Sequence, residues 1–149
     1  MVRSLEGKNP NYFEAILQLR DTTDEIKEFI EDELLRDQIP VTKIQKVTNG
    51  YDYYISDNNY TKALSRKLQQ KFGGEILITS SLHTKKDGKD IYRTTVLFRE
   101  APFRKNDPVE YKGEQYKVIS MSKEILLQNV KNGKKEHIKY KDMKQIKKA

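Results

Sequence analysis

Apolar residues occupy every second position between Tyr12 and Arg20, the first regular pattern along the chain. This period of two places Ala15, Leu17 and Leu19 on the same side of an extended backbone. The other side of the segment is mostly polar. The pattern therefore predicts a strand with one buried face.

A helix is predicted next, because Ile26, Ile30 and Leu34 recur at intervals of four residues. The preceding sequence Thr22-Thr23-Asp24-Glu25 is typical of a capping box, in which a threonine hydroxyl and a glutamate carboxylate bond to free N–H groups of the first turn. Pro40 ends the pattern. The acidic residues of this predicted helix are Asp24, Glu25, Glu28, Glu31, Asp32 and Glu33.

Two hairpins are predicted from glycine-containing turns between strand-like segments. The dipeptides Asn49-Gly50 and Asp87-Gly88 both favour the positive φ angles of a tight hairpin turn. The second hairpin has arms about twice as long as an ordinary strand of about five or six residues. The predicted strands cover residues 42–47 and 51–56 in the first hairpin, and 75–86 and 89–100 in the second.

A second helix is predicted between these hairpins. Asp57 or Asn58 is suited to cap its start, and Gly73-Gly74 is suited to end it. Its apolar stripe consists of Tyr60, Leu64, Leu68 and Phe72.

The order of these elements predicts a ferredoxin-like α+β domain over residues 10–100, with an antiparallel sheet, two helices on one face and an extended hairpin. Residues 101–106 are mostly polar and contain a proline, which favours a linker. Beyond them, short alternating segments are interrupted by Lys112-Gly113 and Asn132-Gly133. We therefore expect a small β-barrel module over residues 107–149.

The charge is unevenly distributed: the chain is acidic near its start and basic near its end. Residues 1–40 contain 5 basic and 10 acidic residues, whereas residues 101–149 contain 13 basic and 6 acidic residues. Such an uneven distribution favours a polyanionic partner for the basic part. The acidic part is then expected to face solvent or a protein partner.

Several classes of function are disfavoured by what the sequence lacks. The chain has no cysteine, which excludes thiolate metal sites and thiol nucleophiles, and it has no run of 18 apolar residues. His83 follows Ser81, but no acid that would orient the imidazole and no nucleophile elbow are evident. We expect no enzymatic activity, no metal, no cofactor and no membrane insertion, and a cytoplasmic location.

The aromatic run Asn49 to Ser56 is superficially similar to the aromatic strand of RNA-recognition motifs. If its tyrosines faced outward, Asp52 would point into the helix-packed core, where an unpaired carboxylate costs several kcal/mol. We therefore predict Tyr51, Tyr53 and Ile55 as core residues.

Clusters of basic residues are the strongest candidates for function, because phosphate contacts dominate nucleic-acid binding. They lie on the second helix, at the end of the long hairpin, in the linker and at a turn of the C-terminal module. For any single lysine, solvation of an exposed turn is the better explanation, whereas the clusters together with the charge distribution make contact with a nucleic-acid backbone about as good an explanation. The candidates for RNA binding are Lys62, Arg66, Lys67, His83, Lys85, Lys86, Lys89, Arg93, Arg104, Lys105, Lys131, Lys134 and Lys135.

Five segments together carry a resemblance to a known family. They are Tyr12 to Arg20, Asn49 to Ser56, Ala63 to Leu68, Lys71-Phe-Gly-Gly-Glu75 and Ser81 to Arg93. In this order and spacing, the chain resembles the archaeal branch of the nonsense-mediated-decay-protein-three family. In eukaryotes, that family supplies the adaptor for nuclear export of the large ribosomal subunit.

The resemblance implies that the chain corresponds to the part after the family's zinc-binding N-terminal region, either separated from it or without it. It also implies binding to the large ribosomal subunit and ribosomal RNA, with ribosomal proteins as further partners, and an SH3-like module over residues 107–149. Export itself is not implied. We expect a monomeric, ribosome-associated factor that acts in subunit biogenesis or quality control. The alternative is a protein-interaction adaptor that works through the acidic first helix.

Overall fold

The computed structural model describes residues 12–149, which divide into two compact units. The described part of the first unit comprises residues 12–66 and 76–99, and the second unit comprises residues 67–75 and 100–149. Each unit is built around a five-stranded sheet, and the chain is of mixed α/β type. The domain boundaries expected from sequence, 10–100 and 107–149, stay a prediction.

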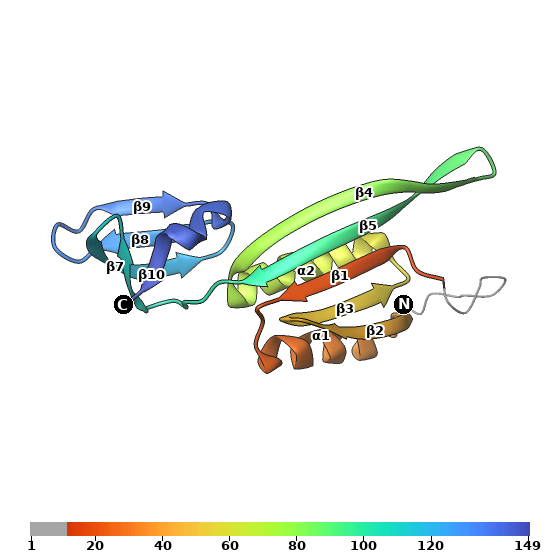
Figure 1. The fold of residues 1–149 in the computed structure, drawn as a ribbon, viewed down its shortest axis with the longest axis horizontal. Helices are drawn as coiled ribbons and strands as arrows, with labels where there is room; N and C mark the ends of the chain where they lie inside the picture. Colours follow the sequence, from red (N-terminus) through yellow and green to blue (C-terminus); the bar gives the residue numbers. More distant parts are fainter. Residues whose placement is uncertain (1–11) are drawn as a thin grey trace. The chain divides into compact units, whose positions relative to one another are not determined.

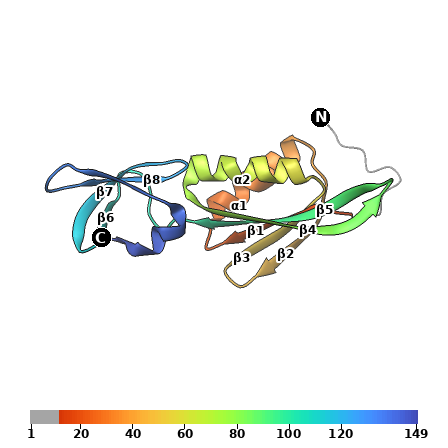
Figure 2. The same cartoon turned by 90° about the horizontal axis from the view of Figure 1, so that it is seen from above.

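The first sheet has the strand order β2-β3-β1-β5-β4. Figure 2 shows α1 and the beginning of α2 on one face of this sheet. The elements are β1 (Ala15–Arg20), α1 (Asp24–Arg36), β2 (Val41–Val47), β3 (Gly50–Ile55), α2 (Asn58–Phe72), β4 (Gly74–Lys86) and β5 (Lys89–Glu100).

The expectation of an antiparallel sheet is wrong at one position. β1 pairs with β3 in antiparallel fashion but with β5 in parallel, from Ala15 opposite Thr94 to Arg20 opposite Arg99. An antiparallel sheet would require β4 beside β1, whereas β4 lies at the outer edge (Figure 1). The tight turn at Asp87-Gly88 then returns the chain as β5 between them, and this strand runs in the direction of β1.

The core of the first unit follows the predicted periodicity. Ala15, Leu17 and Leu19 of β1 are fully buried, as the alternation predicts. Tyr53 and Ile55 of β3 are also fully buried, which confirms them as core residues, whereas Tyr51, predicted with them, is only half-buried. The remaining buried apolar side chains of this core include Ile26, Ile30, Leu64, Val96 and Phe98.

Two local predictions need correction. The N-cap of α1 is Thr23, and its side chain makes no capping hydrogen bond, so the threonine half of the predicted capping box does not form. Asn49 has a φ of 67°, but Gly50 lies outside the left-handed region, because it belongs to β3 and not to the turn. By contrast, Asp57 caps α2 as predicted, accepting a 3.0 Å hydrogen bond from the N–H of Tyr60.

The second unit is a five-stranded sheet with the order β10-β6-β7-β8-β9. Its core includes Ala101 and Phe103, so the segment predicted as a linker contributes to packing instead. The end of α2 belongs to this unit, where the Ala101 N–H donates to the Gly73 carbonyl at 3.2 Å. The elements are β6 (Pro108–Tyr111), β7 (Glu114–Met121), β8 (Ile125–Asn129), β9 (Lys135–Ile138), the 3₁₀ helix η1 (Tyr140–Gln145) and β10 (Ile146–Lys148).

Candidate nucleic-acid interface

The turn end of the β4–β5 hairpin extends beyond the other strands of its sheet (Figure 1). Pairing between β1 and β5 starts at Ala15 opposite Thr94, so residues 89–93 of β5 lie past the start of β1. We call residues 80–93 the hairpin arm. Strand pairing and a two-residue turn make its backbone regular. The charged side chains therefore project from well-defined backbone positions.

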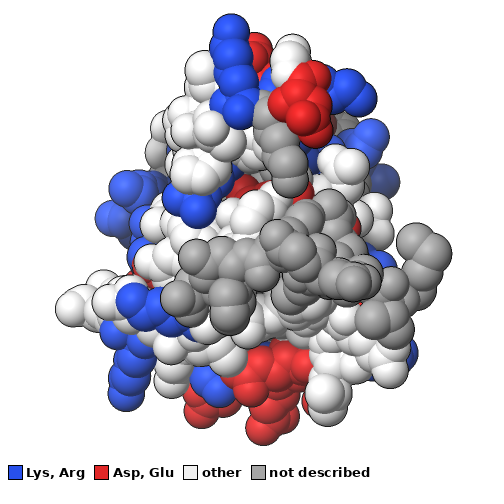
Figure 3. All heavy atoms as spheres, turned by 90° about the vertical axis from the view of Figure 1, so that its right-hand side faces the viewer, with Lys and Arg blue, Asp and Glu red and all other residues white. Residues whose placement is uncertain are grey.

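Three of the predicted residues are exposed on this arm, namely His83, Lys85 and Lys89. The Lys85 ammonium lies 3.8 Å from the Asp90 carboxylate, so part of its charge is balanced locally. Lys86 belongs to β4, and its side chain is outside the described part of the structure. Figure 3, which faces this end of the first unit, shows basic and acidic side chains together at the top of the view, where the arm ends.

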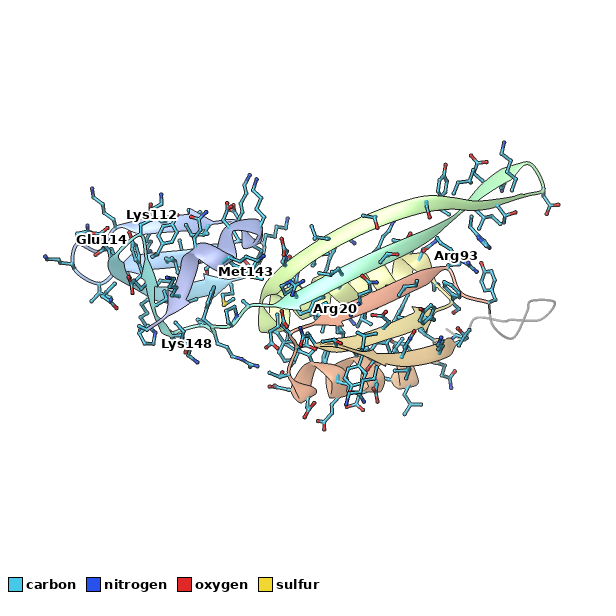
Figure 4. All side chains as sticks on the ribbon, in the orientation of Figure 1. Arg20, Arg93, Lys112, Glu114, Met143 and Lys148 are labelled. Atoms are coloured by element: carbon cyan, nitrogen blue, oxygen red, sulfur yellow. The ribbon has the colours of Figure 1, made fainter. Side chains whose placement is uncertain are left out.

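Arg93, labelled in Figure 4, has a different environment from the lysines of the arm. Its guanidinium carbon lies 3.9 Å from the centroid of the Phe13 ring, and its Nε donates a 3.3 Å hydrogen bond to the Phe13 carbonyl. These contacts attach the arm to the chain before β1. A half-buried arginine used in this way is a positioning residue of the arm.

The basic residues of α2 differ in exposure. Lys62 is half-buried and lines a hollow between α2 and β5, whereas Arg66 and Lys67 are exposed.

In the second unit, Arg104 and Lys105 line a cleft of about 430 Å³ together with Lys71 from the end of α2. We call this the basic cleft. The Phe72 ring lies near two of the cations, with its centroid 5.8 Å from Lys71 Nζ and 5.9 Å from the Arg104 guanidinium carbon. The lining residues are Gln70, Lys71, Phe72, Arg104, Lys105, Ser120 and Met121.

A buried acidic residue orients the arginine side chain of the basic cleft. Arg104 Nη2 donates a 3.1 Å hydrogen bond to Glu100, whose side chain is 5% exposed. The backbone N–H of Arg104 is fixed by Asp107 at 2.8 Å. Sequence reasoning missed Lys71, because it is separated from Arg104 by more than thirty positions and the two residues come together only in the folded unit.

The third predicted cluster lies at the turn between β8 and β9, where Lys131, Lys134 and Lys135 are exposed. Asn129, which is 3% exposed, organises this turn. Its Oδ1 accepts hydrogen bonds from the N–H groups of Lys131 at 2.8 Å and Asn132 at 3.1 Å. The role of Asn129 was not predicted from sequence. An asparagine three residues before Asn132-Gly133 is nevertheless a sequence signal for such a turn.

The histidines and acidic residues of residues 12–149 bear on other kinds of site. His83 is exposed, and His137 lies 4.0 Å from Glu124. Within this range, no group of three or more His, Cys, Asp or Glu side chains is arranged to hold a metal ion. The described helices also include none that is long and apolar enough to cross a membrane.

Comparison with known protein families matches residues 12–99 to NMD3, second domain. Curated proteins yield no match to the chain. The matched segment covers more than half of the 149 residues and runs from the start of β1 almost to the end of β5. The archaeal branch and the missing zinc-binding region stay predictions. On the strength of this match, the chain belongs to the NMD3 family.

Proposed function

We propose that the chain is a non-enzymatic factor that binds the large ribosomal subunit through ribosomal RNA, in subunit biogenesis or quality control. The NMD3 family associates with the large ribosomal subunit and generally serves as an adaptor for its export. Family membership therefore supports ribosome association. The proposal adds the RNA contact and assigns residues to it.

The basic cleft is the observation that carries the RNA contact. Lys71, Arg104 and Lys105 bring three cations to one concave surface of the second unit. Buried Glu100 balances one of these charges and fixes the arginine fork, which leaves a net positive cleft. A fixed guanidinium and two lysines are suited to phosphate oxygens, and Gln70 and Ser120 add neutral donors.

The hairpin arm and the β8–β9 turn provide further cations on ordered backbone. Contacts to phosphates position a protein on RNA, whereas shape and unstacked bases provide specificity. The proposal therefore assigns positioning to the basic cleft, the arm and the turn.

The finer description of the fold belongs to the same proposal. The βαββα order with a β2-β3-β1 sheet supports a ferredoxin-like first domain, modified by the inserted parallel β5. Five short strands with a 3₁₀ turn before the last one support an SH3-like second module. As a large-subunit factor, the protein would act in the cytoplasm as a monomer and be of archaeal type.

The salt dependence of binding to purified large subunits tests this function. Each cation that contacts a phosphate contributes about 0.7 to 0.9 to the slope of log K against log salt. Replacing Lys71 and Lys105 by alanine should weaken binding and flatten the slope by about 1.4 to 1.8. The control replaces Lys117 and Lys147, two exposed lysines of the same unit outside the cleft. Equal slopes for the two double variants would contradict the cleft assignment.

A second candidate function is protein binding at the acidic α1, which a groove beside this helix favours. The groove is about 520 Å³ and is mainly apolar. Two apolar side chains at it are unusually exposed, Leu35 at 79% and Ile44 at 50%. Its lining is Glu31, Leu34, Leu35, Gln38, Ile39, Val41 and Ile44.

This candidate predicts a different signature. Acidic side chains gather at the lower edge of Figure 3, where Figure 1 places α1, so a basic protein segment with apolar anchors would fit the groove. Replacing Leu35 and Ile44 by serine should then weaken binding to large subunits without changing the salt slope. Unchanged affinity of this variant would exclude the groove as a binding surface for the subunit.

A further inference from the structure

We propose that the hollow between α2 and β5 in the first unit binds a single unstacked guanine base of the RNA. This inference rests on the proposed function and specifies what one of its surfaces recognises. The hollow is about 520 Å³ and is open to solvent. Its lining residues are Glu14, Asn58, Asn59, Lys62, Ser80, Asp90, Ile91, Tyr92 and Thr94.

The amide of Asn58 provides the first argument. Its Nδ2 donates a 3.1 Å hydrogen bond to the Tyr92 carbonyl, and its backbone N–H donates to Glu14 Oε1 at 3.2 Å. The Tyr92 carbonyl therefore fixes the orientation of the amide, because a flipped amide would bring two oxygens together. Asn58 Oδ1 is buried without a hydrogen-bond partner among the described residues. A buried acceptor of this kind costs free energy until a donor reaches it.

The surrounding groups favour a ligand that donates hydrogen bonds. Glu14 and Asp90 place two carboxylates at the same hollow, where Glu14 also accepts a hydrogen bond from the Tyr12 hydroxyl and Asp90 lies 3.8 Å from Lys85 Nζ. The hydroxyls of Ser80 and Thr94 lie 3.2 Å apart, and each can donate or accept. Acceptors therefore dominate the polar surface of the hollow.

Tyr92 and Lys62 determine the class of ligand. The side chain of Tyr92 is 47% exposed, so an aromatic face is accessible at the rim for stacking. Lys62, half-buried in the first turns of α2, places a cation at the same hollow, and a cation can pair with the phosphate of a bound nucleotide. An aromatic face, a cation and hydrogen-bond acceptors are the components with which proteins recognise a splayed-out base.

Among the four bases, guanine fits this set best. Its Watson–Crick edge presents two adjacent donors, the ring N1–H and the exocyclic amine, next to the O6 acceptor, whereas adenine, cytosine and uracil each present a single donor group on this edge, flanked by acceptors. A donor beside an acceptor would satisfy Asn58 Oδ1 and then direct the acceptor toward a carboxylate. The acceptor-rich hollow therefore selects guanine.

Single-stranded RNA tests this assignment directly. Binding of the full chain is measured for oligouridine, for the same oligomer with one central guanosine, and for the same oligomer with inosine, which lacks the exocyclic amine. We expect the guanosine oligomer to bind about tenfold more tightly than oligouridine, with inosine between them. Asn58→Ala should remove this preference, and Tyr92→Leu should weaken binding to all three oligomers.

The control is Gln45→Ala, which removes an exposed amide from β2 of the same unit and should keep the guanosine preference. Thermal unfolding of each variant establishes that it is folded, and the comparison of the three oligomers with the unaltered chain needs no variant. Equal affinity for the three oligomers would overturn the guanine assignment and leave the proposed function standing. Absence of binding to any of them and to large-subunit RNA would overturn both.

Discussion

Position 50 requires glycine, because any larger residue would add a Cβ atom that clashes with the neighbouring strand. A Cβ at Gly50 would lie 1.7 Å from the Leu19 carbonyl oxygen of the neighbouring strand β1. The φ of Gly50 is outside the left-handed region, so the requirement for glycine is purely steric. Gly88 is the opposite case, with a φ of 76° and open space around its Cβ position.

The two glycines predict substitutions of different cost. Gly50→Ala should lower the free energy of unfolding by about 3 kcal/mol, because β1 and β3 must separate to admit a methyl group. Gly88→Ala should cost only about 1 kcal/mol, since it introduces a left-handed alanine without a clash. Urea unfolding of both variants measures the difference. Similar losses for the two would mean that β1 shifts freely away from β3.

The sequence could not show which residue pairs with the Asp52 carboxylate. Its side chain is 11% exposed and lies 2.8 Å from Arg20 Nη1, which also donates to the Leu19 carbonyl at 2.8 Å. The charge is therefore buried at the face of the sheet and paired.

Removing this carboxylate should be costly. Asp52→Ala leaves Arg20 half-buried without its ion-pair partner and should lower the free energy of unfolding by about 1 to 3 kcal/mol. Gln45, the register partner of Asp52 on β2, is exposed and provides the control, since Gln45→Ala should cost less than about 0.5 kcal/mol. Chemical denaturation of the two variants compares them, and equal stability would argue against a stabilising ion pair.

At the scale of elements, the long hairpin is the most distinctive part of the first unit. Its turn chemistry is readable in sequence, and Asp87 and Gly88 have the predicted positive φ angles of 51° and 76°. The position of each strand in the sheet cannot be predicted from sequence, because both strands of the hairpin contain apolar residues suited to lie beside β1. Burial of Val96 and Phe98 on β5 decides the order.

The hairpin arm should contribute to RNA binding without contributing to stability. Replacing Lys85 and Lys89 by alanine should flatten the log–log salt slope of large-subunit binding by about 1.4 to 1.8, because each lysine neutralises one phosphate. Unfolding free energy should change by less than about 0.5 kcal/mol, since both side chains are exposed. The matched control replaces Lys43 and Lys46, which are exposed on β2 at the other edge of the same sheet. If both double variants have the slope of the unaltered chain, the arm only keeps a protruding edge solvated.

At the scale of the whole molecule, each unit has its own core, and the core of the second unit contains the buried Tyr140. Burial raises the pKa of Tyr140 to about 12, and an interaction with the backbone of Gly74 opposes this shift. The hydroxyl belongs to the first residue of η1, between β9 and β10.

The direction of the pH effect follows from this shift. Because the folded pKa of Tyr140 exceeds its ordinary value of 10, the neutral form is favoured by folding, and its contribution is complete below about pH 10. That contribution is lost progressively as the pH rises from about 10 towards about 12. Tyr140→Phe should make the unfolding free energy of the second unit less dependent on pH in this window. Urea unfolding at a series of alkaline pH values measures it, and identical pH dependence in the variant would contradict the assignment.

Local patterns in the sequence were sufficient for the parts of the protein that depend on neighbouring residues. Alternation in β1, the stripe Leu64, Leu68 and Phe72 in α2, the Asp57 cap and the Asp87-Gly88 turn all appear in the structure. The family was also identifiable from sequence segments in order. These features depend on residues within a few positions of one another, where backbone geometry and periodicity act directly.

Only the tertiary structure decided the features that join distant segments. The parallel pairing of β1 with β5, the burial of Phe103 in the second core and the approach of Lys71 to Arg104 each link residues far apart in sequence. The hollow that contains Asn58 likewise combines two strands, a helix and the residue before β1. Such juxtapositions depend on which of several compatible packings buries the most apolar surface, and that quantity belongs to the folded chain as a whole and to no single segment of it.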